Sequence, residues 1–135
     1  MIEIQNHTKH SVHGALLCRL GNRTLAKEGK EGEDVSVACV PEREMRRLNK
    51  TYRNKEYAAN VLSFNENKFG LGEIVLCPSV IRKEAKEYGI TYKEELCRML
   101  VHGLLHLLGY GHERGANEAK KMEQKEKEYL APFTN

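Results

Sequence analysis

Three histidines near the C-terminus have the spacing of a metal site. They are His102, His106 and His112, in the run H-G-L-L-H-L-L-G-Y-G-H. In a helix, His102 and His106 lie about 40° apart around the axis and one turn apart along it, so they share a face. Gly109 is a natural left-handed stop, after which the chain can bring His112 back toward the other two. Three imidazoles with a fourth position open are typical of a catalytic zinc ion, one per chain.

The same spacing occurs in the metzincin peptidases, whose motif H-E-x-x-H-x-x-G-x-x-H also includes the glycine at Gly109. Those enzymes carry a glutamate after the first histidine that activates the water on the metal, whereas this chain has Gly103. A zinc peptidase is therefore the second candidate. A structural metal in a non-catalytic RNA- or ribosome-binding module remains open as well, although closed zinc sites usually include cysteine. Two core histidines with an unrelated third are a further alternative.

A basic segment lies between residues 41 and 60. It holds six basic and three acidic side chains, so its excess equals the net charge of +3 for the whole chain. Such local charge suits a polyanionic partner, although a solvated helix face explains it equally well. The basic residues are Arg43, Arg46, Arg47, Lys50, Arg53 and Lys55.

The elements that position these residues follow from hydrophobic spacing. Alternating apolar residues predict four short strands, with a hairpin-like link between the last two. The strands are expected at residues 2–4, 35–39, 61–64 and 74–77. Helical spacing predicts helices from Ser11 to about Glu28, from Pro41 onward, from Pro78 to Gly89, from Thr91 to about Leu108 and from about Asn117.

The sequence also predicts which faces of these helices are buried. Met45, Leu48 and Tyr52 form a stripe on the second helix. Thr91 and Glu94 form a capping box at the start of the helix that carries the histidines. The last helix has Ala119, Met122, Tyr129 and Leu130 facing inward, and the balanced charges of its other face are typical of solvated surface. The predicted fold is α+β (mixed α/β), with a small mixed sheet of about four strands packed against about five helices.

Composition excludes several classes of protein. With 135 residues, 40% hydrophobic and 30% charged, the chain is expected to form one soluble domain over residues 1–135. No stretch approaches the ~18 apolar residues of a membrane span, and the N-terminus does not resemble a secretory signal, so we expect a cytoplasmic protein with no membrane partner. The cysteines Cys18, Cys39, Cys77 and Cys97 lack C-x-x-C spacing and are expected to be reduced core residues.

Several segments, taken together, resemble one known family. V-S-V-A-C-V-P-E-R-E-M-R-R-L-N-K-T-Y-R at 35–53 is similar to its strand and helix before a conserved arginine. N-V-L-S-F at 60–64 and L-G-E-I-V-L at 71–76 look like its next two strands, and M-E-Q-K-E-K-E-Y-L at 122–130 looks like its closing helix. With the histidine run, nearly the whole chain resembles the YbeY family, endoribonucleases of bacterial ribosomal RNA maturation.

The resemblance implies a metal-dependent hydrolase domain in which His102, His106 and His112 hold zinc. It implies that Arg53 is functional and that the chain cleaves single-stranded RNA, maturing the 3′ end of 16S ribosomal RNA. It further implies a cytoplasmic role in ribosome quality control, with the small ribosomal subunit or its proteins as partners.

The residues themselves suggest roles within such a reaction. Arg53 carries a planar, permanently charged fork that suits a bidentate phosphate contact, although an ion pair with Glu56 is the simpler alternative. The basic residues Arg46, Lys50 and Lys55 could hold neighbouring phosphates. Glu113, beside His112, is the candidate general base.

Three positions depart from the family's usual pattern. Gly111 stands where aspartate is usual before the third histidine, Ala59 where threonine is usual and Glu73 where aspartate is usual. Histidines that bind a metal normally have a carboxylate or carbonyl partner, so Gly111 puts ligand orientation in question. We expect these changes to affect activity rather than the fold.

Overall fold

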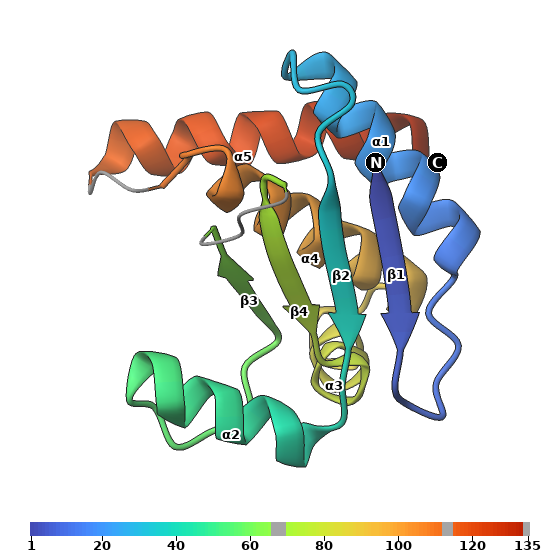
Figure 1. Ribbon diagram of the computed structural model, residues 1–135, viewed down its shortest axis with the longest axis vertical. Coiled ribbons are helices and arrows are strands. Elements are labelled where there is room, and N and C mark those ends of the chain that lie inside the picture. Colours follow the sequence, from blue (N-terminus) through green and yellow to red (C-terminus); the bar gives the residue numbers. More distant parts are fainter. Residues whose placement is uncertain (66–69, 112–114, 134–135) are drawn as a thin grey trace.

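A mixed sheet forms the centre of the protein, as seen in a computed structural model that describes residues 1–65, 70–111 and 115–133 (Figure 1). Its strand order is β1-β2-β4-β3, with β1, β2 and β4 parallel and β3 antiparallel to β4. This confirms the predicted mixed sheet and the pairing of its last two strands, although β4 begins two residues earlier than predicted. The strands are β1 (Ile2–Asn6), β2 (Val35–Cys39), β3 (Val61–Phe64) and β4 (Gly72–Leu76).

Five helices surround the sheet within the described residues, as predicted. In Figure 1, α4 runs behind the strands and α5 crosses the top of the view. None of the described helices combines the length and the apolar character needed to cross a membrane. The helices are α1 (Gly14–Lys27), α2 (Glu42–Arg53), α3 (Pro78–Tyr88), α4 (Tyr92–Leu107) and α5 (Ala116–Leu130), followed by a short 3₁₀ helix (Ala131–Phe133).

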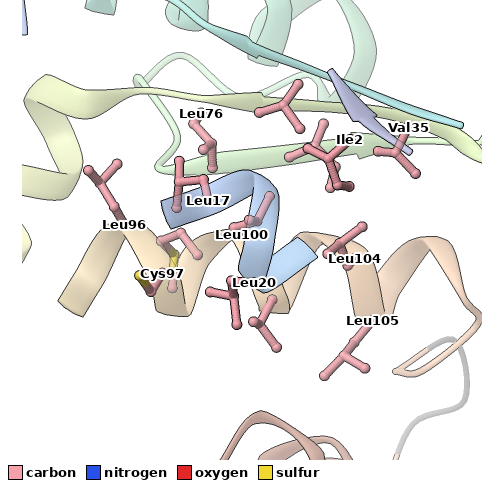
Figure 2. Close-up of a cluster of buried hydrophobic side chains, with 14 of the residues drawn as sticks. Ile2, Leu17, Leu20, Val35, Leu76, Leu96, Cys97, Leu100, Leu104 and Leu105 are labelled. Atoms are coloured by element: carbon pink, nitrogen blue, oxygen red, sulfur yellow. The ribbon is translucent and has the colours of Figure 1, made fainter. Parts of the chain in front are cut away.

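The main core lies between α1, α4 and one face of the sheet. Successive strand side chains point to opposite faces, so alternate residues of β1, β2 and β4 reach this core. Because α4 is buried along most of its length, the helix that carries His102 and His106 is held firmly against the sheet. Figure 2 shows the core side chains of α1 (Leu17, Leu20), α4 (Leu96, Leu100, Leu104) and the strands (Ile2, Val35, Leu76).

The opposite face of the sheet is only partly covered. Met45 of α2 packs there against Leu62 and Val75 in a second, smaller core. Farther along this face, Ser36 and Glu73 are exposed. The result is a concave surface in which α2 stands beside an open stretch of sheet.

Three details differ from the expectations. The first helix begins at Gly14 rather than Ser11, because His13 adopts a left-handed conformation with φ 49° that a helix cannot include. Tyr52 was predicted to be buried but is 64% exposed, since the last turn of α2 extends past the residues that cover Met45. Ala119 is exposed rather than inward-facing, because Met122 is the first buried residue of α5.

Candidate functional site

Helix α4 presents His102 and His106 on one face, one turn apart. Its start is fixed as predicted, because the Thr91 hydroxyl accepts a hydrogen bond from the Glu94 backbone N–H at 3.0 Å. Gly109 takes a φ of 101° just beyond the helix, which is a conformation that favours glycine. The two histidines are half-buried, and their Nε2 atoms lie 3.0 Å apart.

This separation fits two ligands of one metal ion. Two nitrogens bound at about 2.0–2.1 Å to a tetrahedral zinc ion lie roughly 3.3 Å apart, so the imidazoles need to move by only a few tenths of an ångström. His112, the predicted third ligand, lies outside the described residues. The residues that the structure does describe contain no cluster of three His, Cys, Asp or Glu side chains able to hold a metal, so the full ligand set stays a prediction.

Glu126 contacts the outer nitrogen of His102. Its Oε1 lies 2.6 Å from Nδ1 of His102, and its side chain is 13% exposed. A carboxylate that accepts the Nδ1–H leaves Nε2 free of its proton, which is the form a metal ion binds. The sequence does not indicate this residue, because the balanced charges of the last helix are typical of a solvated face.

A second set of contacts fixes α5 so that Glu126 can reach α4. Glu28, just past the end of α1, accepts hydrogen bonds from the hydroxyls of Tyr110 and Tyr129, at 2.8 Å in the case of Tyr110. Burial and the bond to Glu28 raise the pKa of Tyr110 to about 12, so this hydroxyl remains a donor near neutral pH. Lys125 lies 3.9 Å from the same carboxylate. These contacts join the C-terminal ends of α1 and α4 to α5.

Arg98 brings a positive charge to the same region. It lies one turn before His102 and donates to the buried Glu95 carboxylate, with Nε 2.6 Å from Oε1. The pKa of Arg98 is raised, chiefly by its hydrogen bonds to Glu95 and further by the charges of Glu95 and Glu126. The guanidinium therefore attracts the carboxylate that contacts His102.

The two histidines open onto a cavity of about 700 Å³. Arg53, the last residue of α2, lines the same cavity, so residues about 50 positions apart in the sequence meet there. Among the described residues, Arg53 makes no ion pair, including the one with Glu56 that we considered as its simpler role. The remaining lining comes mainly from β3 and the end of α2, and includes Tyr52, Asn60, Ser63 and Phe64.

The last turn of α2 has a defined geometry. Asn54 ends the helix in a left-handed conformation, with φ 56°. The buried amide of Asn49 donates to the backbone carbonyl of Tyr57 at 2.8 Å, which ties the following loop back to the helix. These contacts hold Arg53 at the edge of the cavity.

The other residues predicted to bind substrate lie outside the cavity. Arg46, Lys50 and Lys55 are exposed and do not line the cavity. On a helical projection, Arg46 and Lys50 lie on the same side of α2 as Arg53, so they extend its positive charge away from the cavity. Glu113, the predicted base, lies outside the described residues.

The cysteines contribute no metal ligand near this site. All four are free thiols, with Cys39, Cys77 and Cys97 buried and Cys18 half-buried. Burial raises the pKa of Cys39 and of Cys97 to about 11, so these thiols stay protonated near neutral pH. The predicted role as small core residues is confirmed for the three buried ones.

A comparison with known families identifies the chain. The family model described as endoribonuclease YbeY matches residues 2–134. The chain belongs to the YbeY family of endoribonucleases. It is 39% identical to endoribonuclease YbeY of Bdellovibrio bacteriovorus, covering 79% of this chain and 72% of that relative. It is 35% identical to endoribonuclease YbeY of Geobacter sulfurreducens, covering 99% and 96%.

A solved structure supports the fold. The solution structure of TM1509 from Thermotoga maritima matches with a TM-score of 0.67 and 28% identity, over 98% of this chain and 91% of that one. As a member of the YbeY family, the chain is an RNA hydrolase, so the comparisons favour the nuclease over the zinc peptidase and the non-catalytic module.

Gly103, which stands where the peptidases carry glutamate, packs closely against the sheet. A Cβ atom at Gly103 would lie 3.2 Å from both Cγ2 of Ile74 and Oγ of Ser63. Ser63 also donates to the Gly103 carbonyl at 3.0 Å. A larger side chain at this position would therefore require Ile74 and Ser63 to shift by a few tenths of an ångström.

The structure also shows what surrounds Gly111, the position where the YbeY family usually has aspartate. A Cβ atom at Gly111 would lie 3.0 Å from Cε1 and 3.4 Å from Nδ1 of His106. The aspartate usual in the YbeY family would therefore lie beside this edge of the ring. Gly111 has φ 79°, which favours glycine. A carboxylate contact is nevertheless present at the neighbouring histidine, through Glu126.

We expect Glu126→Gln to weaken metal binding by about 10- to 100-fold, the usual effect of losing an outer partner of a ligand. The amide keeps the size of the side chain but does not stabilise the Nδ1–H of His102 as a carboxylate does. A competition titration with a chromophoric chelator measures the affinity. Glu123→Gln is the matched control, because Glu123 is exposed on the same helix and pairs with Lys127 at 3.3 Å. Equal affinities in the two variants would contradict the role of Glu126.

Proposed function

We propose that this YbeY-family endoribonuclease cleaves single-stranded RNA with one zinc ion per chain, held by His102, His106 and His112. The observation that supports it most directly is the shared cavity, where the paired Nε2 atoms of His102 and His106 open beside the guanidinium of Arg53. A metal site next to a fixed cation suits an anionic phosphodiester.

When bound, zinc supplies a water of lowered pKa and polarises a phosphoryl oxygen. The side chains of this protein have the remaining tasks. Glu126 keeps a proton on Nδ1 of His102, so that Nε2 is available as a ligand. Arg53 contacts the phosphate with two N–H groups and stabilises the charge that develops during cleavage. We assign proton transfer to Glu113, as predicted from its place beside His112.

The substrate we propose is 16S ribosomal RNA near its 3′ end, processed in the cytoplasm on or beside the small ribosomal subunit. The exposed side chains of Arg46, Lys50 and Lys55 support a long anionic substrate rather than a single nucleotide, because they continue the positive charge beyond the cavity. The resemblance to a family of ribosomal RNA maturation factors supports the choice of RNA.

The decisive experiment is RNA cleavage with and without metal. Protein purified without chelator is expected to contain about one zinc ion per chain and to cleave a labelled single-stranded RNA, while leaving a duplex of the same sequence intact. Removal of the metal should reduce cleavage to background, and stoichiometric Zn²⁺ should restore it. Folded, metal-free protein that cleaves at the full rate would overturn the proposal. Binding of RNA without cleavage by the loaded protein would favour the non-catalytic module instead.

A further inference from the structure

Tyr52 and Phe64 form an aromatic pair at the rim of the cavity. Their ring centroids lie 5.1 Å apart in an edge-to-face arrangement. Tyr52 is 64% exposed and Phe64 is half-buried. The phenol ring is therefore braced from one side by Phe64 while much of its surface faces solvent.

The pair lies where two hollows of the surface meet. Both rings line the cavity that contains His102, His106 and Arg53. Both also line a groove of about 580 Å³ between α2 and the open face of the sheet. A chain that runs from the cavity into this groove passes beside the Tyr52–Phe64 pair.

The neighbours of the pair favour a nucleic acid strand over an apolar partner. Arg53 lines the same cavity as Tyr52, so a phosphate held by its guanidinium and the adjoining base would lie in one hollow with the phenol ring. Proteins that take up single-stranded RNA combine such cationic contacts with aromatic rings on which unpaired bases stack. Glu44 and Glu73 also line the groove, and their negative charge favours placing the phosphates on the Arg53 side of the aromatic pair.

We propose that Tyr52 is a stacking platform for one unpaired base of the RNA, next to the phosphate at Arg53, with Phe64 holding the phenol ring in position. The inference rests on the proposed RNA-cleaving function and names the part of the substrate that this rim recognises. Stacking needs an unpaired base, so the pair would also select single strands over duplex.

The test uses the full, metal-loaded protein and short single-stranded RNAs that carry 2-aminopurine at one position at a time. Stacking on an aromatic ring quenches this base, and stopped-flow mixing reads the quenching before cleavage proceeds. Wild-type protein is expected to quench at one position near the cleaved bond. Tyr52→Leu should lose that quenching and bind about 5- to 150-fold more weakly, whereas Tyr52→Phe should remain within about twofold of wild type.

Tyr88→Leu is the matched control, because Tyr88 is 57% exposed on α3 and lines neither hollow. It should bind and quench as wild type does. If Tyr52→Leu quenches and binds like wild type, or if wild type quenches at no position, the stacking platform is overturned. A loaded wild-type protein that quenches through Tyr52 yet never cleaves RNA would overturn the nuclease proposal alone.

Discussion

The variant His106→Ala is expected to lose its bound metal ion and its RNA cleavage together. The Nε2 atoms of His106 and His102 lie 3.0 Å apart, so one ion would contact both, and removing either leaves an incomplete ligand set. The loss of affinity should exceed the 10- to 100-fold that is typical for an outer partner of a ligand. Both losses are measured on the same preparation. The metal content is determined after dialysis, and cleavage of labelled RNA is followed under single-turnover conditions.

The control for His106→Ala is His13→Asn. His13 is exposed at the start of α1 in a left-handed conformation that asparagine tolerates, so this variant removes an imidazole without disturbing the backbone. It should retain metal and activity. If His106→Ala kept one metal ion per chain and cleaved at the wild-type rate, the histidine pair would have no part in the reaction, and a different set of ligands would have to be sought.

Helix α4 shows what the sequence could predict. Local signals predict it: the capping box of Thr91 and Glu94, the apolar spacing and the stop at Gly109, whose positive φ the structure confirms. Each of these depends only on neighbouring residues, so no knowledge of the remaining fold was needed. The sequence motif also shows that the glutamate is missing at Gly103, whereas the close approach of Ile74 to this position becomes visible only when the sheet is in place.

Glu126 shows what the sequence could not predict. The acidic and basic residues of the last segment balance, and its helical spacing has no feature that separates Glu126 from its exposed neighbours. Its contact with His102 spans 24 positions and depends on the hydroxyl contacts of Tyr110 and Tyr129 with Glu28. A pattern within one helix cannot reveal which of its charges another helix will bury.

Tyr52 shows a second limit of prediction from the sequence. Helical periodicity correctly places it on the same side of α2 as Met45, which is fully buried. Periodicity gives the direction of a side chain but not how far the covering layer extends. Here the cover ends before the last turn of the helix, so the ring lies at the surface beside Arg53, where it is available for a ligand rather than for the core.

Arg53→Ala is expected to separate substrate binding from metal binding. Arg53 is exposed at the last residue of α2 and a guanidinium is a poor metal ligand, so zinc content should not change and the melting temperature should change little. Cleavage should nevertheless fall by about 10²- to 10³-fold, as when one fixed donor to a developing charge is removed. Arg53→Lys should restore only part of the rate, because an ammonium group cannot make the two-pronged contact.

Arg47→Ala is the matched control for this series. Arg47 lies on the same helix and carries the same charge, but it pairs with Glu44 and does not line the cavity. Removing it lowers the net charge equally, so a general electrostatic effect on RNA binding would appear in both variants. A large loss of cleavage in Arg53→Ala alone therefore assigns the effect to the position of Arg53 beside the histidines. Equal cleavage rates in the two variants would mean that Arg53 acts only as one more charge on a basic helix. Loss of zinc from Arg53→Ala would instead mean that Arg53 supports the shape of the metal site.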